Sequence, residues 1–185
     1  MARPENCIDW VLSHEVDGFG TSHEAKSFNI DQGGPTKYGI TIPFLKEWGP
    51  SGDKDHDGNF DIEDIRALLP DDARAAVKSV IWDKCRVSSI ASDLIARKWL
   101  DVAVNGCPSV ATRVLQRACN AILPMGILKD DGILGPKTIL SANSLMPHVV
   151  IEQMRHYQKE FYLAVLRKHP EYENCRKGWL NRAAR

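Results

Sequence analysis

The sequence has 185 residues, of which 43% are apolar and 26% are charged, as in ordinary globular proteins. Its 24 basic and 24 acidic residues give a formal net charge of zero, so overall charge provides no argument for a nucleic-acid partner. No run approaches the roughly 18 apolar residues of a membrane span, and the N-terminus lacks the apolar core of a secretory signal. We therefore expect a monomer made in the cytoplasm, with no nucleic-acid partner and no insertion into a membrane.

The N-terminal part of the chain predicts one helix followed by a small β-hairpin. Residues 4–14 favour a helix because Pro4 suits a first turn and apolar residues recur at helical spacing. Glu15 falls at or just past the end of this helix, before a glycine-containing segment that breaks it. Within residues 27–41, the turn residues Gly33-Gly34-Pro35 precede β-branched and aromatic residues, which indicates a short hairpin.

From residue 61 onward the sequence is mainly helical. A loop is expected between Pro124 and Pro136, with a long helix after it. The predicted fold class is therefore mainly α (α+β), with one small β-hairpin near the N-terminus. Three apolar stripes predict core-facing helices: Ala73, Ala76, Val77, Val80 and Ile81; Leu94, Ile95, Trp99, Ala103 and Val104; and Val110, Val114, Leu115, Ala118 and Ile122.

Glu15 is the candidate for acid catalysis. Cleavage of a glycosidic bond needs a carboxylic acid that protonates the leaving oxygen, and a half-buried position raises the pKa of such an acid towards working pH. Glu15 follows an apolar helix and precedes a turn that opens space beside it. The alternative is a solvated glutamate at a helix end.

Three hairpin residues are candidates to complete the site around this acid. Asp31 could hold a water as general base or stabilise a cationic transition state, and Thr36 could position that water. Tyr38 could stack on a sugar ring. The alternatives stay open, because Asp31 could equally bond its own backbone in a turn and Tyr38 could be a core aromatic.

Motifs in the first half resemble a known family. The chain reads Ser13-His14-Glu15, then Gly18-Phe19, then Asp31-Gln32-Gly33-Gly34-Pro35-Thr36-Lys37-Tyr38-Gly39-Ile40-Thr41. This resembles glycoside hydrolase family 108, whose motif is His-Glu-Gly-Gly-Tyr followed by Asp-Pro-Gly-Gly-x-Thr-Lys-Tyr-Gly-Ile. Its members are N-acetylmuramidases with a lysozyme-like fold and include phage endolysins. The resemblance implies that Glu15 is the catalytic acid and that the β-1,4 bond between N-acetylmuramic acid and N-acetylglucosamine is cleaved.

The second half resembles the peptidoglycan-binding part of the same family. The matching segments are Trp82-Asp83, Asp101-Val102-Ala103-Val104-Asn105-Gly106, Leu115-Gln116-Arg117-Ala118, Asp131-Gly132-Ile133-Leu134-Gly135-Pro136-Lys137-Thr138 and Gly178-Trp179-Leu180-Asn181-Arg182. We expect a catalytic lobe over residues 1–88 and a helical peptidoglycan-binding region over 89–185, integral to the same fold. Gln116, Arg117 and Lys137 are candidates to touch glycan or stem peptide; the alternative is solvated polar residues beside a core helix.

Residues 53–64 predict a structural calcium loop. Oxygen ligands recur at the spacing of a 12-residue calcium loop, with Gly58 at the sharp turn. Two features depart from that pattern: the last position is Asp rather than Glu, and Gly49-Pro50 precludes a long incoming helix. A flexible solvated loop is the alternative. The predicted ligands are Asp53, Asp55, Asp57, Asn59, Asp61 and Asp64.

Other catalytic chemistries have little support in the sequence. The six histidines show no metal-site spacing, no serine lies in a nucleophile-elbow motif, and the five cysteines are expected to be free thiols. Two rival functions remain: a lytic transglycosylase that uses the same Glu15, and a wall-binding module without catalysis. With no export signal, a holin-type pore or another export route would have to deliver the protein to the cell wall.

Overall fold

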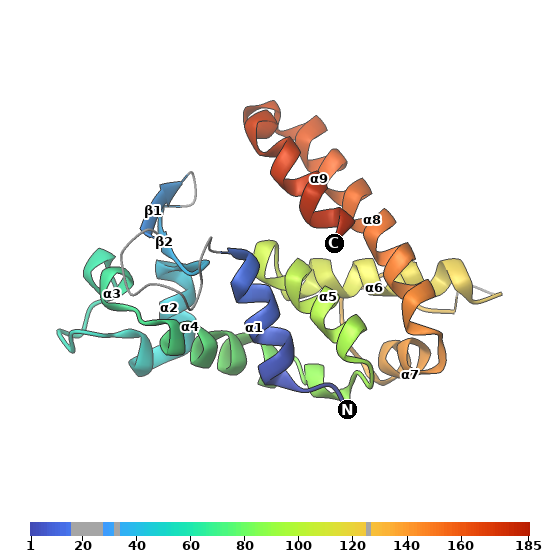
Figure 1. Cartoon of the computed structure of the whole chain (residues 1–185), viewed down its shortest axis with the longest axis horizontal. Helices are drawn as coiled ribbons and strands as arrows, with labels where there is room; N and C mark the ends of the chain where they lie inside the picture. Colours follow the sequence, from blue (N-terminus) through green and yellow to red (C-terminus); the bar gives the residue numbers. More distant parts are fainter. Residues whose placement is uncertain (16–27, 32–33, 125–126) are drawn as a thin grey trace. The chain divides into compact units, whose positions relative to one another are not determined.

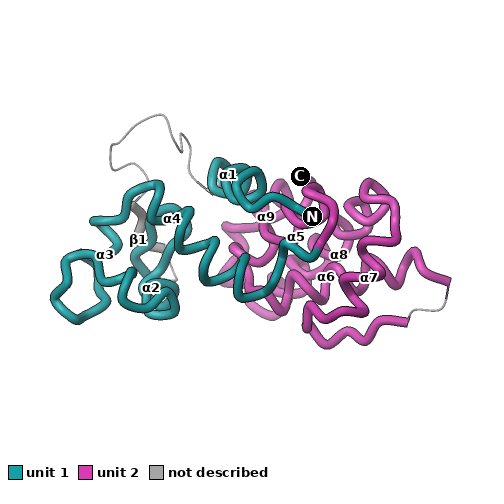
Figure 2. The backbone as a smooth tube through the Cα atoms, turned by 90° about the horizontal axis from the view of Figure 1, so that it is seen from below, with its two compact units in different colours: residues 1–89 teal, residues 90–185 magenta. Residues whose placement is uncertain are grey.

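The computed structural model describes residues 1–15, 28–31, 34–124 and 127–185, which divide into two compact units (Figures 1 and 2). The first unit comprises residues 1–89 and the second residues 90–185. The predicted boundary between 88 and 89 lies one residue from this division. Whether the second unit is integral to the fold of the first stays a prediction.

The first unit combines short helices with a small antiparallel sheet. The sheet has the order β1-β2-β3, and α2 and α3 contact its β2 strand. Helix α1 packs on α4 and on η2, the π-helical segment that continues α4. The elements in chain order are α1 (Pro4–Glu15), β1 (Phe28–Asp31), β2 (Gly34–Lys37), β3 (Ile40–Thr41), α2 (Ile42–Trp48), η1 (Gly49–Gly52), α3 (Ile62–Ala67), α4 (Pro70–Val77), η2 (Lys78–Asp83) and η3 (Val87–Ser89).

The strand register explains the shape of the hairpin. Asp31 pairs with Gly34, and Lys37 pairs with Ile40. The second pairing leaves the two-residue turn Tyr38-Gly39, and both residues have positive φ angles of 56° and 76°. Two positive φ angles are typical of the hairpin turn whose twist matches that of the strands. The sequence predicted the hairpin but not its third strand, which has only two residues.

The second unit is a helical bundle. Helix α8 packs against α6, α5 and α9, and α9 runs back beside α8 after a short turn (Figure 1). Its elements are α5 (Asp93–Asn105), α6 (Pro108–Ile122), α7 (Pro136–Ser144), α8 (Pro147–Lys168), η4 (Pro170–Cys175) and α9 (Arg176–Ala184). No helix within the described ranges is both long and apolar enough to cross a membrane.

The predicted apolar stripes form much of the core. All five residues of the first stripe are buried, as are Ile95, Trp99 and Ala103 of the second. Val104 is half-buried, and Leu94 is 46% exposed because adjacent residues of a helix point about 100° apart and Ile95 occupies the inward position. The predicted mainly helical fold with a small N-terminal hairpin is confirmed. All five cysteines are free thiols, with Cys7 and Cys119 buried.

A buried polar network ties α5, α8 and α9 together. The Asp101 carboxylate is fully buried and accepts a hydrogen bond from Nε of Arg182 at 2.9 Å. A second nitrogen of Arg182 donates to the side-chain oxygen of Asn105, whose amide donates to the Tyr162 hydroxyl, both at 2.9 Å. Lys98 is 3% exposed and donates to two carbonyls at the end of α9. Two segments of the family resemblance, residues 101–106 and 178–182, therefore meet in a buried structural network.

Candidate functional site

The end of α1 is held by side chains of its own last turn. The Nδ1 atom of His14 lies 2.6 Å from the Trp10 carbonyl oxygen, which can only accept, so Nδ1 carries the proton. The Ser13 hydroxyl donates to the same carbonyl at 2.7 Å. The His14 ring also packs on the Trp10 ring, with centroids 4.3 Å apart. These contacts fix the helical turn that ends at Glu15, as predicted; the Glu15 side chain lies outside the described residues.

The hairpin holds the other predicted catalytic residues. Asp31 is the last residue of β1, and its side chain, like that of Glu15, lies outside the part of the chain that the structure describes. Thr36 sits in the middle strand, half-buried, opposite Asn29 and Thr41. The Lys37 ammonium donates to the Arg66 carbonyl at 2.6 Å, which ties the sheet to α3, and burial lowers the pKa of Lys37.

Tyr38 does not present an open stacking surface. Its residue is 8% exposed and lies at the first position of the two-residue turn. The Lys37 ammonium lies 5.6 Å from the centre of its ring. In this conformation Tyr38 is a buried hairpin aromatic, the alternative that the sequence left open, and stacking on a sugar would require the turn to move.

The acidic loop folds around three converging carboxylates. Asp53, Asp55 and Asp57 each offer an oxygen within 4.8 Å of the other two. The Gly58 amide donates to Oδ2 of Asp53 at 3.0 Å, and Gly58 has a φ of 85°. The Asn59 backbone and side-chain amides both donate to Asp57, which lowers the pKa of that carboxyl group. The loop thus adopts the tight turn that the spacing predicted, with Gly58 at the position that needs it.

The remaining predicted metal ligands have other hydrogen bonds. Asp61 caps α3 by accepting from the Glu63 amide at 2.8 Å. Asp64 is 1% exposed and accepts from the Lys54 amide at 2.6 Å and the Asp61 amide at 2.9 Å. Asp64 therefore joins the two ends of the loop, and the structure gathers Asp53, Asp55 and Asp57 more closely than it does the other three.

In the second unit, Gln116 is a structural residue. It is 1% exposed, and its amide nitrogen lies within hydrogen-bond distance of Asp131 Oδ1 at 2.8 Å and of Thr138 Oγ1 at 3.2 Å. Its oxygen accepts from the Gly132 amide at 3.0 Å. Contact of Gln116 with the wall stays a prediction, and in this conformation its polar atoms anchor the loop before α7.

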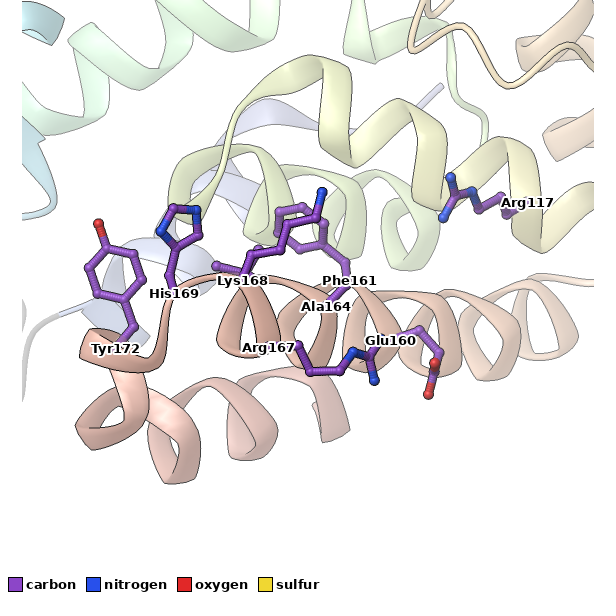
Figure 3. Close-up of a pocket in the computed structure, with 9 residues that line it drawn as sticks. Arg117, Glu160, Phe161, Ala164, Arg167, Lys168, His169 and Tyr172 are labelled. Carbon is purple, nitrogen blue, oxygen red and sulfur yellow. The ribbon is translucent and has the colours of Figure 1, made fainter.

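Arg117 and Lys137 remain available at the surface. The Arg117 guanidinium binds Oδ2 of Asp130 at 2.7 and 2.8 Å with its side chain 48% exposed. Lys137 lies exposed in the first turn of α7. Arg117 also lines a pocket between α6 and the α8–η4 corner (Figure 3). The sequence motifs do not reveal the rest of this pocket, whose one signal in the sequence is the basic run Arg167-Lys168-His169.

The family of the chain is decided by a match over residues 8–106 to the model described as glycosyl hydrolase 108. The chain belongs to the glycosyl hydrolase 108 family. The matched part includes α1 from Ile8 onward and the whole hairpin, and it supports glycoside hydrolase activity. Residues 110–184 match a second model, described as a predicted peptidoglycan domain. Together the two matches imply that this family member hydrolyses peptidoglycan.

A solved structure shares the fold of this family member. The "Structure of Brucella abortus SagA" superposes with a TM-score of 0.67 over 98% of this chain and 93% of that chain, at 18% sequence identity. At that identity the likeness shows the fold alone. No curated protein matches the chain.

Proposed function

We propose that this family member is an N-acetylmuramidase that hydrolyses the β-1,4 bond between N-acetylmuramic acid and N-acetylglucosamine, with Glu15 as the proton donor. One observation carries the proposal: the family match covers the last two turns of α1, and the final residue of that helix is the motif glutamate. The ordered turn of Trp10, Ser13 and His14 holds the backbone at that point.

The position of Glu15 favours the proton-donor role physically. The last carbonyl groups of a helix carry a partial negative charge, which opposes a carboxylate placed there and favours its protonated form. Glu15 is the final residue of the 12-residue helix α1. A glycosidic acid must hold its proton until the leaving oxygen takes it.

Asp31 and Thr36 complete the proposed chemistry. Asp31 orients a water molecule or stabilises the positive charge that develops on the sugar, and Thr36 hydrogen-bonds that water. Both belong to the β1–β2 hairpin, in which Asp31 pairs with Gly34 and Thr36 pairs with Asn29. Neighbouring strands bonded in this register hold the two residues at a fixed spacing.

The test uses purified peptidoglycan and mass spectrometry of the products. Glu15→Gln should lower turnover about 100- to 10,000-fold, the usual contribution of a general acid. The matched control is Glu5→Gln, which makes the same change at the exposed start of the same helix and should leave turnover unaltered. Full activity of Glu15→Gln would refute the assignment of the acid.

The same digest separates this proposal from its rivals. Reducing muramic acid ends indicate hydrolysis, whereas 1,6-anhydro ends indicate a lytic transglycosylase. An intact polymer would leave only a wall-binding module. The biological setting that we propose is phage-driven lysis, with release through a pore formed by a partner; a bacterial enzyme that opens the wall for secretion is the other setting.

We also propose that the acidic loop holds a structural Ca²⁺. Carboxylate and carbonyl oxygens are the ligands that this ion prefers, and Asp53, Asp55 and Asp57 supply three converging carboxylates. Among the described residues, Oδ1 of Asp53 is buried and has no hydrogen-bond partner. Partial desolvation raises the pKa of Asp55, and the negative charges of Asp57, Asp64 and Asp53 raise it further. A cation would satisfy the orphan oxygen and relieve this repulsion.

Melting curves test the calcium proposal. Calcium at about 100 times its dissociation constant should stabilise the protein by about 2.7 kcal/mol relative to chelator. Asp55→Asn should abolish that increase, whereas Asp83→Asn, an exposed carboxylate paired with Lys78, should retain it. Equal melting temperatures in calcium and chelator would exclude the site.

A further inference from the structure

The second unit contains an open pocket that none of the motifs explains. Its volume is about 570 Å³, large enough for a peptide or a sugar fragment. The last turns of α8 and the start of η4 form one wall, and Arg117 of α6 stands on the other (Figure 3). The pocket lies entirely within the unit that matches the peptidoglycan model.

The charged side chains that line the pocket are mostly basic. The basic residues Arg117, Arg167 and Lys168 line it together with one acidic residue, Glu160. Arg117 is held by Asp130, which also lies 3.9 Å from the guanidinium of Arg113, so this acid is shared between two cations. Within the described residues, no carboxylate pairs with Arg167 or Lys168, and both are exposed. The pocket therefore carries unneutralised positive charge.

The pocket also has an apolar floor of half-buried side chains. Phe161, Ala164 and Val165 form it, and Tyr172 closes one end. Other aromatic rings pack against these side chains. Phe161 contacts Tyr162, whose ring stacks on the Trp179 ring with centroids 5.2 Å apart. Trp179 in turn contacts Tyr172 at 6.0 Å. A continuous row of ring contacts fixes the aromatic surface before any ligand arrives, which reduces the entropic cost of binding.

We propose that this pocket binds the carboxylate-bearing stem peptide of peptidoglycan. The carboxylates pair with Arg167, Lys168 and Arg117, and the aliphatic part of the peptide lies on Phe161, Ala164 and Val165. The proposal rests on the peptidoglycan-directed function proposed above. Charge complementarity favours the peptide over the glycan, because in an intact wall the lactyl carboxyl group of muramic acid is consumed in the amide bond, whereas stem peptides retain free carboxylates.

This pocket would bind the enzyme to the cell wall independently of bond cleavage. A stem peptide held by the second unit is covalently joined to the glycan strand that the first unit cuts. Linking two binding events in this way raises the effective concentration of the second. Substrates that carry peptides should therefore be bound more tightly than bare glycan strands.

The experiment measures the affinity of a soluble disaccharide-tetrapeptide for the Glu15→Gln protein by calorimetry, so that turnover does not interfere. The double charge reversal Arg167→Glu/Lys168→Glu should weaken binding about tenfold or more, as expected for charge-assisted hydrogen bonds. Phe161→Ala should weaken it less. The matched control reverses two exposed lysines that do not line the pocket, Lys159→Glu/Lys177→Glu, and should keep the affinity.

Two ligands sharpen the result. A muropeptide whose carboxyl groups are amidated should bind the Glu15→Gln protein about as weakly as the acidic muropeptide binds the charge-reversed protein. A glycan without peptides should bind the Glu15→Gln protein and the charge-reversed protein equally. Unchanged affinity in both the charge-reversed and the Phe161→Ala proteins would overturn the proposal. That failure is distinct from failure of the catalytic assignment, which would appear as cleavage by the Glu15→Gln protein with binding intact.

Discussion

The two units use their polar residues in opposite ways. In the first unit the candidates lie at the ends of elements: Glu15 ends α1, Asp31 ends β1, and the acidic loop precedes α3. In the second unit two polar residues of the family segments are interior, whereas Arg117 and Lys137 stay at the surface. Asp101 and Gln116 are 0% and 1% exposed, and both form hydrogen bonds with other residues of the same unit. The proposed chemistry therefore lies with polar residues at element ends in the first unit, whereas Asp101 and Gln116 serve the architecture of the second.

The strongest test of this contrast is Asp101→Ala. Removing this carboxylate leaves the buried Arg182 and Lys98 without their acidic partner, and breaking a buried ion pair in this way costs about 3–5 kcal/mol. Denaturant unfolding followed by circular dichroism measures the loss. The control is Asp83→Ala, which removes an exposed pair with Lys78 and should cost no more than about 1 kcal/mol. Equal losses in the two variants would show that Asp101 is not architectural.

The second test asks whether Gln116 binds wall or holds the loop. Gln116→Ala removes the hydrogen bonds to Asp131, Gly132 and Thr138, which should cost about 1–3 kcal/mol because buried partners lose their bonds. Cleavage by a protease within residues 127–135 should accelerate as the loop loosens. The neighbouring change Arg117→Ala should alter stability far less, since Arg117 is half exposed. A stable Gln116→Ala protein with weakened wall binding would reverse our interpretation.

The sequence could predict the helices and the hairpin but not which polar residues would turn inward. Periodicity reports the face of a helix that is buried, and it placed Ile95 and Trp99 correctly. It cannot show that Gln116, on an apolar helix, meets a loop some 15 residues later, because that contact depends on how the loop folds around Gly132. The site candidates of the first unit came from the resemblance and from the ends of elements, and the turn at Tyr38-Gly39 buries Tyr38, the predicted sugar-stacking residue.

The smallest predicted effect concerns Lys98. Burial lowers the pKa of this ammonium group from 10.5 to about 8. Between pH 8 and 10.5 the folded protein holds Lys98 neutral while the unfolded chain keeps it protonated, so the unfolded state binds more protons and stability from this group rises with pH. The slope is at most about 1.4 kcal/mol per pH unit.

The contribution of Lys98 to this pH dependence is measured by comparing wild type with Lys98→Met. The comparison is needed because buried thiols change stability with pH in the opposite direction. Burial raises the pKa of Cys119 to about 11, so the thiol lowers stability above pH 9 in both proteins and cancels in the difference. The free energy of unfolding of wild type relative to Lys98→Met should increase from pH 7.5 to pH 9. A flat difference would mean that Lys98 stays charged in the fold, held by Asp101 and the carbonyls of Arg182 and Ala183. The interior of the second unit would then tolerate a full ammonium charge, and its contrast with the first unit would lie in pairing rather than in burial.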